Sequence, residues 1–201
     1  MSTLEFAITW DYRCPFAWKA NDHVVTGLDG GADWNVKFVP FSLGQVHVGE
    51  GETDIWERPD DDSGLLALRT GVVVRDHHPE AFNGVHRSLF EIRHRHSGDL
   101  RDREAIEKVL TDHGVDADEV FAEIESGRPL ETIRREHEAY AASHEVWGVP
   151  TFIAGDQAVF VRLMNSPSDD AGESIKAVER IVDLLTGWVD LNEFKHTSIP
   201  R

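Results

Sequence analysis

The first third of the chain alternates short apolar runs with one stretch of helical period. Leu4–Trp10 (LEFAITW) is short, apolar and rich in strand formers, so it predicts a buried strand. After a three-residue turn, Pro15 favours a first helical turn, and two glycines after Leu28 predict the end of that helix. Trp34–Leu43 predicts a second strand, with Pro40 placing its later part at an edge or a bulge. Strand, helix and strand in this order indicate a parallel βαβ unit.

A block of helical period follows. The segment 44–63 is polar and predicts a long loop, and from Gly64 to Trp147 apolar residues recur at helical spacing. Five helices are expected there, around Leu65–Val73, Phe82–Ile92, Asp102–Leu110, Asp116–Ile124 and Pro129–Tyr140.

Strand periodicity returns near the C-terminus. Pro150–Ala154 and Ala158–Leu163 predict a β-hairpin, followed by an amphipathic helix over Ala171–Leu185 and an extended tail over 190–201. The expected order is therefore βαβ, a helical block, and ββα. It indicates an α/β protein in which residues 1–63 and 148–201 form one domain and residues 64–147 form an inserted helical domain.

Charge and cysteine content exclude several classes of protein. The 201 residues include 20 Lys and Arg against 37 Asp and Glu, for a formal net charge of −17. Such an acidic chain repels phosphate backbones and anionic lipids, so neither nucleic acid nor a membrane is an expected partner. The single cysteine, Cys14, rules out an internal disulfide and a multi-cysteine metal site. The N-terminus has no basic segment followed by an apolar one, which favours a cytoplasmic location.

Cys14 lies between the end of the first strand and the Pro15 helix start. A thiol at a helix N-terminus meets free backbone N–H groups and the positive end of the helix dipole, and both favour the thiolate. Arg13 adds positive charge and Asp11 opposes it. We therefore expect the pKa of the Cys14 thiol to be lowered. The alternative is that Cys14 is a small buried core residue.

Aromatic and histidine side chains admit two interpretations as well. Trp10, Phe16, Trp18 and Trp147 flank this region and either wall an apolar groove or belong to the core, with Phe16 expected to be the most exposed. The 11 histidines show no recognisable metal-ligand spacing, so no metal site is expected. His86, on an apolar helix face, is expected to be a hydrogen-bonded core residue.

Two motifs carry a family resemblance. DYRCPFAW (11–18) and WGVPTF (147–152), in this order and at this distance, resemble the C-P-x-C and cis-proline motifs of the DsbA-like branch of the thioredoxin-fold superfamily. The segment 38–47 and the C-terminal tail are most similar to actinobacterial members, some of them mycothiol-dependent reductases. The resemblance implies a thioredoxin-like fold with a large helical insertion, a cis bond before Pro150 and Cys14 as nucleophile. It also implies contacts to a substrate or thiol from Pro15, Phe16, Ala17, Trp18, Val149, Pro150 and Thr151.

Ala17 occupies the place of the second cysteine in that motif. A mixed disulfide on Cys14 therefore has no internal partner to resolve it. This favours a monothiol oxidoreductase that acts on a small-molecule thiol or disulfide and binds no cofactor. Mycothiol or glutathione is the expected co-substrate, and the protein is expected to be a monomer or a homodimer. One alternative is a thiol-dependent transferase or isomerase, resembling kappa-class glutathione transferases and hydroxychromene-carboxylate isomerases. The other is a non-catalytic binding protein with the same fold.

Overall fold

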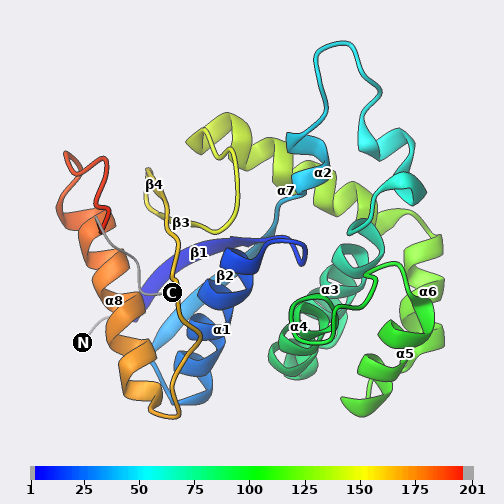
Figure 1. Ribbon diagram of the computed structural model, residues 1–201, viewed down its shortest axis with the longest axis horizontal. Coiled ribbons are helices and arrows are strands. Elements are labelled where there is room, and N and C mark those ends of the chain that lie inside the picture. The colour runs from blue at the N-terminus through cyan, green and yellow to red at the C-terminus, as the bar shows by residue number, and fades with distance from the viewer. Residues whose placement is uncertain (1–2, 197–201) are drawn as a thin grey trace.

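A mixed four-stranded sheet lies at the centre of the computed structural model, which describes residues 3–196 (Figure 1). The strands follow the order β2-β1-β3-β4, and their bounds are Leu4–Trp10 (β1), Trp34–Pro40 (β2), Thr151–Ala154 (β3) and Gln157–Phe160 (β4). β1 runs parallel to β2 and antiparallel to β3, which pairs in turn with antiparallel β4. The predicted parallel βαβ unit and C-terminal hairpin are both confirmed.

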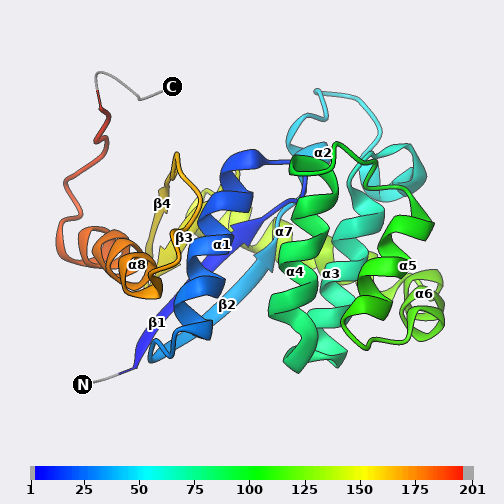
Figure 2. The same ribbon diagram turned by 60° about the horizontal axis from the view of Figure 1, so that its bottom comes forward.

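Two helices pack together on the sheet. α1 (Pro15–Asp29) contacts β1, and α8 (Ala171–Gly187) contacts α1, β3 and β4. Figure 2 shows both helices in front of the sheet, with α7 (Arg128–His144) partly hidden behind it. α7 contacts β2, so helices cover the sheet from both sides.

The remaining helices lie to one side of the sheet in both ribbon views (Figures 1 and 2). They connect β2 to β3 and comprise α2 (Leu43–Val46), α3 (Leu65–His77), α4 (Pro79–His94), α5 (Arg103–Asp112) and α6 (Ala117–Glu125), followed by α7. The carboxylates of Asp102 and Asp116 accept hydrogen bonds from the first amides of α5 and α6, which is why these helices begin where their sequence predicts. One continuous apolar core spans the sheet and the inserted helices, so the division into two domains stays a prediction.

Several boundaries differ from the sequence prediction. β2 ends at Pro40 rather than at 43, because Ser42 begins the short helix α2 by accepting a hydrogen bond from the amide of Gly44. β4 ends at Phe160 rather than at 163, and the amide of the next residue, Val161, donates to the carbonyl of Pro150. The predicted loop 44–63 contains two 3₁₀ turns, Ile55–Glu57 and Pro59–Asp61.

The C-terminal segment agrees with prediction as far as it is described. Residues 191–196 have no regular secondary structure, and the rest of the predicted tail, 197–201, lies outside the described residues. Within residues 3–196, no helix combines the length and the apolar character that crossing a bilayer requires.

Candidate active site

Cys14 occupies the N-cap position of α1, directly beyond the C-terminal end of β1. Its Sγ accepts a hydrogen bond from the amide of Ala17 at 3.4 Å and donates one to the carbonyl of Val149, also at 3.4 Å. The residue is 8% exposed. The first turn of α1 and the loop before β3, which are 135 positions apart in sequence, therefore meet at this sulfur atom.

The peptide bond between Val149 and Pro150, in the loop that faces the thiol, is cis, as predicted. Thr151 is buried and fixes the base of this loop: its amide donates to Thr9 Oγ1 at 2.8 Å, and its hydroxyl donates to the carbonyl of Gly148 at 2.8 Å. Pro15 is exposed and Ala17 is fully buried. The structure thus brings the two motifs together, while contact between their residues and a ligand stays a prediction.

The expected lowering of the Cys14 pKa is wrong. Burial of the thiol raises its pKa; the amides of Ala17 and Phe16 lower it, as a helix N-terminus should, and the negative charge of Asp11 raises it further. Arg13 does not compensate, because its guanidinium pairs with Asp11 at 2.8 Å and with Asp62 at 2.9 Å. At neutral pH the sulfur is therefore mostly a thiol that donates to the Val149 carbonyl.

The raised pKa of Cys14 can be measured by titration. The ionisation midpoint of Cys14, followed by thiolate absorbance near 240 nm, should be higher in the folded protein than in the same protein unfolded in urea. Cys14 is the only cysteine in the chain, so the part of the signal that is absent from Cys14→Ser belongs to it, once the absorbance of the two ionising tyrosines has been subtracted with that variant. A lower midpoint in the folded state would show that the helix N-terminus dominates over burial.

Asp11 and Asp62 tie the Cys14 turn to the helical insertion. Asp11 is buried, accepts from the backbone and side chain of Arg13, and accepts from the amide of Leu43 at 2.7 Å. Asp62 accepts from Arg13 and from the first amides of α3. Asp62 belongs to the acidic run Asp60–Asp62 in the polar segment 44–63, for which solvated carboxylates are the simplest expectation. That expectation is wrong for Asp62, because its carboxylate is largely buried and pairs with Arg13.

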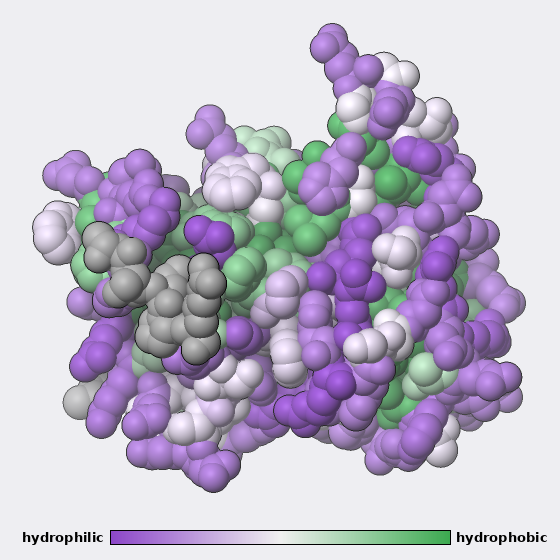
Figure 3. All heavy atoms as spheres, in the orientation of Figure 1, coloured by the Kyte–Doolittle hydropathy of each residue, from purple (hydrophilic) through white to green (hydrophobic). Residues whose placement is uncertain are grey.

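The aromatic residues near Cys14 divide into core and surface. Trp10 is fully buried, Phe16 and Trp18 are partly buried, and Trp147 is 65% exposed, so Trp147 rather than Phe16 is the most exposed of the four. Trp147 packs against Phe160, with 4.6 Å between ring centroids. Figure 3 shows hydrophobic surface gathered between the β3–β4 hairpin and α2, at the end of the sheet where Cys14 lies.

His94 is a neighbour of this site that the sequence pattern did not single out. Its ring stacks on Trp18, with 5.3 Å between centroids and a 9° angle, and its Nε2 donates to the carbonyl of Tyr12 at 2.9 Å. Burial lowers the pKa of His94. Helical spacing alone could not reveal this contact, because the partners belong to α1 and α4.

A buried polar chain lies beneath the Cys14 turn. The amide nitrogen of Asn21 donates to backbone carbonyls, so its oxygen accepts from His86 Nε2 at 3.2 Å, and His86 Nδ1 accepts from the Tyr12 hydroxyl at 2.8 Å. His86 is 1% exposed, as predicted for a hydrogen-bonded core histidine. Gly71 makes room for the chain, since a Cβ at that position would lie 2.3 Å from the Tyr12 hydroxyl oxygen.

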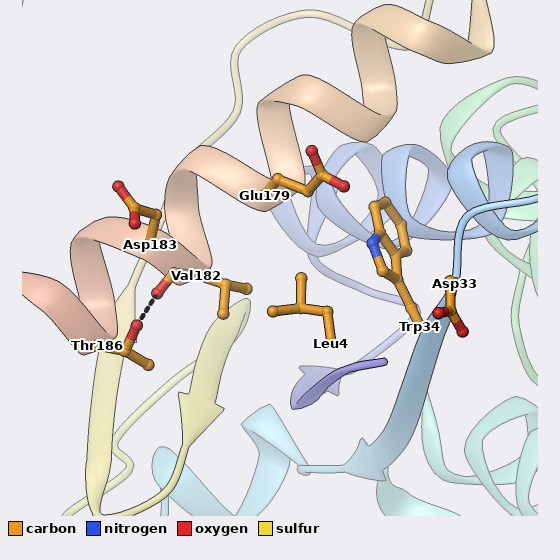
Figure 4. Close-up of a pocket in the computed structure, with 7 residues that line it drawn as sticks. All are labelled: Leu4, Asp33, Trp34, Glu179, Val182, Asp183 and Thr186. Carbon is orange, nitrogen blue, oxygen red and sulfur yellow. Dashed lines mark hydrogen bonds between the residues drawn. The ribbon is translucent and has the colours of Figure 1, made fainter. Parts of the chain in front are cut away.

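A surface pocket of about 360 Å³ lies elsewhere (Figure 4). It is lined by Leu4, Asp33, Trp34, Glu179, Val182, Asp183 and Thr186. Leu4 begins β1, whereas Cys14 follows the end of the same strand, so the pocket and the thiol lie at opposite ends of the sheet.

Comparison with known proteins agrees with this architecture. The chain is 24% identical over 201 residues to the uncharacterized protein Rv2286c of Mycobacterium tuberculosis, covering 100% of this chain and 84% of that protein. Among solved structures, a 2-hydroxychromene-2-carboxylate isomerase superposes with a TM-score of 0.64 at 14% identity, covering 94% of this chain and 100% of that one. The thiol-disulfide exchange protein alpha-DsbA2 from Wolbachia pipientis superposes with a TM-score of 0.60 at 18% identity, covering 92% and 83%.

At these identities the structural likeness shows the fold, which is thioredoxin-like with a large helical insertion, as predicted. The family follows from the sequence model for the DSBA-like thioredoxin domain, which matches residues 7–168. That span begins in β1 and includes Cys14, the inserted helices and the Val149–Pro150 bond. The chain belongs to the DSBA-like thioredoxin domain family.

Proposed function

We propose that this protein is a monothiol thiol–disulfide oxidoreductase that uses a low-molecular-weight thiol as its second substrate. The observation that carries the proposal is the position of Cys14 Sγ, between the amide of Ala17 and the carbonyl of Val149, in a chain with no other cysteine. Membership of a family that includes oxidoreductases supports the same chemistry.

The reaction needs two exchanges at one sulfur atom. In the first, the Cys14 thiolate attacks one sulfur of a disulfide; a Cys14–S bond to that sulfur forms, the original S–S bond breaks, and the leaving thiolate takes a proton. In the second, the thiolate of a low-molecular-weight thiol attacks the substrate-derived sulfur of the mixed disulfide; a new S–S bond forms, the bond to Cys14 Sγ breaks, and the Cys14 thiolate is restored. In each cycle the low-molecular-weight thiol replaces one thiol of the substrate disulfide, which leaves as a free thiol.

The residues around Cys14 fit these steps. The carbonyl of Val149 accepts a hydrogen bond from the resting thiol, and the amide of Ala17 stays in place to donate to the thiolate. A raised pKa leaves little thiolate at neutral pH but makes that thiolate intrinsically more nucleophilic. The exchange rate should therefore increase with pH over the range in which Cys14 ionises.

The same protonated thiol supports a second candidate function. A neutral S–H can donate a hydrogen bond to the sulfur of a bound thiol, as a thiol-dependent transferase or isomerase would require. The fold of the 2-hydroxychromene-2-carboxylate isomerase is compatible with this alternative. The two candidates differ in one respect that can be measured: only the oxidoreductase forms a covalent bond to Cys14.

Mass spectrometry of the folded protein tests the proposal. Incubation with an oxidised low-molecular-weight thiol, glutathione or mycothiol, should add one thiol to the peptide that contains Cys14, and the reduced thiol should remove it. The urea-unfolded protein is the matched control for the intrinsic reactivity of the thiol. The proposal fails if Cys14 is modified in the unfolded protein and stays unmodified in the folded one.

A further inference from the structure

The segment that follows β4 runs along α1 beside the reacting thiol. The amide of Val161 donates to the carbonyl of Pro150 at 3.1 Å. Three residues later, the carbonyl of Met164 accepts from Lys19 Nζ, on the second turn of α1. Figure 1 shows this connection between β4 and α8 passing along α1. The segment therefore starts at the cis-proline loop and borders the first turns of the helix that Cys14 caps.

Arg162 is the charged residue that this segment places over the first turn of α1. Its guanidinium carbon lies 5.4 Å from the ring centroid of Phe16, whose amide lies near the Cys14 sulfur. The Arg162 side chain is exposed, and among residues 3–196 it makes neither a hydrogen bond nor an ion pair. Arg13, the other arginine of the site, is held by two carboxylates. Of these two arginines, only Arg162 lacks an ion pair within the described part of the chain.

The positive charge of Arg162 lies on a molecule that is acidic as a whole. The protein carries a formal charge of −17, so its general field repels anions. Glu193 lies close enough for Arg162 to lower its pKa, but its carboxylate pairs with Lys195 at 2.5 Å. Lys19 adds a second positive charge along the same segment. Arg162 and Lys19 thus place two positive charges along this segment of an acidic molecule.

We propose that Arg162, lying over Phe16, binds a carboxylate of the thiol or disulfide that reacts at Cys14. The substrate class is then a low-molecular-weight thiol that carries a negative charge a few bonds from its sulfur. The inference rests on the proposed thiol exchange and adds the charge selectivity of the site. The partly buried Phe16 ring supplies an apolar surface for the carbon chain between carboxylate and sulfur.

Three small disulfides of similar size and different charge test this selectivity. These are 3,3′-dithiodipropionate (anionic), 2-hydroxyethyl disulfide (neutral) and cystamine (cationic). The rate of mixed-disulfide formation at Cys14 is measured for each and divided by the rate for the unfolded protein, which removes the intrinsic reactivity of the disulfide. The wild-type protein should prefer the anion to the neutral compound and the neutral compound to the cation, and salt should reduce the preference.

The variants separate Arg162 from the net charge of the molecule. Arg162→Gln should lower the ratio of anionic to neutral rates about fivefold, the size expected for one exposed charge contact. Arg162→Lys should retain most of the ratio. Arg180→Gln is the matched control, since Arg180 is exposed on α8 and also lacks a hydrogen bond or ion pair within the described part of the chain.

Two results would contradict the proposals in different ways. If Arg162→Gln keeps the wild-type ratio, or if Arg180→Gln lowers it as much, Arg162 does not select the substrate, and thiol exchange at Cys14 still stands. If the folded wild-type protein fails to react even with the neutral disulfide, the exchange itself is wrong, and the selectivity falls with it.

Discussion

Replacing Cys14 by serine should lower the proposed thiol-dependent disulfide reduction to the uncatalysed rate. The hydroxyl cannot form a mixed disulfide, whereas it can still cap α1, because serine is a favoured N-cap residue. The variant should therefore fold and lose only its chemistry. Reduction of 2-hydroxyethyl disulfide by a low-molecular-weight thiol, compared with the reaction without protein, measures the loss, and a thermal unfolding curve checks the fold.

Ala17→Cys is the matched gain of function. Ala17 lies three residues after Cys14 and its amide already contacts Cys14 Sγ, so a second thiol there can attack a mixed disulfide from within the same chain. We expect this variant to form an internal disulfide and to release the bound thiol. If Cys14→Ser keeps its activity, the transferase or isomerase is favoured instead. If no form is active, the non-catalytic binding protein is favoured.

Acid should weaken the fold through His86. Burial lowers the pKa of His86 to about 3, whereas in the unfolded chain the residue takes up a proton below its ordinary pKa of about 6.5. The unfolded state therefore binds more protons as pH falls from about 6.5 to about 3, and the free energy of unfolding decreases over that window. Between pH 6.5 and pH 4 this one residue should remove about 3 kcal/mol of stability.

Two variants isolate the contribution of His86. His86→Leu breaks the contacts to Tyr12 and Asn21 and should cost roughly 2–4 kcal/mol at neutral pH, because their polar groups remain buried without partners. Between pH 6.5 and pH 4, the free energy of unfolding of His86→Leu should fall by about 3 kcal/mol less than that of the wild type. Phe82→Leu, which alters a ring stacked on His86, is the control and should keep the wild-type pH dependence. Urea unfolding at pH 6.5 and pH 4 gives the free energy of unfolding of the wild type and of both variants. Equal pH dependence in His86→Leu and the wild type would exclude His86 as a source of the acid sensitivity.

His137 adds to the same pH dependence. Its ring stacks on Phe41 with 3.9 Å between centroids, and burial lowers its pKa to about 4. Because it is neutral in the folded state, its protonation in the unfolded chain also favours unfolding between about pH 6.5 and pH 4. The His86→Leu variant should therefore retain part of its acid sensitivity.

The order of elements was accessible from sequence because each element carries a local signal. Asp102 and Asp116 mark two helix starts, and the short apolar run Leu4–Trp10 marks an inner strand of the sheet. Cys14 and Pro150 could be paired because their motifs resemble those of one family and occur in the same order.

The electrostatics of the site depend on contacts between distant segments and were not accessible in this way. The sign of the Cys14 pKa shift depends on burial of the thiol beneath the loop at Val149, which is 135 positions away in the sequence. Likewise, nothing local to Arg162 indicates that β4 ends before it and leaves its charge over Phe16.

Two-substrate kinetics provides the most direct test of exchange through a single thiol. Initial rates are measured while the concentrations of a disulfide and a low-molecular-weight thiol are varied independently. A covalent intermediate on Cys14 separates the two half-reactions, so parallel double-reciprocal lines are predicted, together with a mixed disulfide on Cys14 when the thiol is withheld. Converging lines without that adduct would mean that both substrates bind before any chemistry takes place, and would contradict the account.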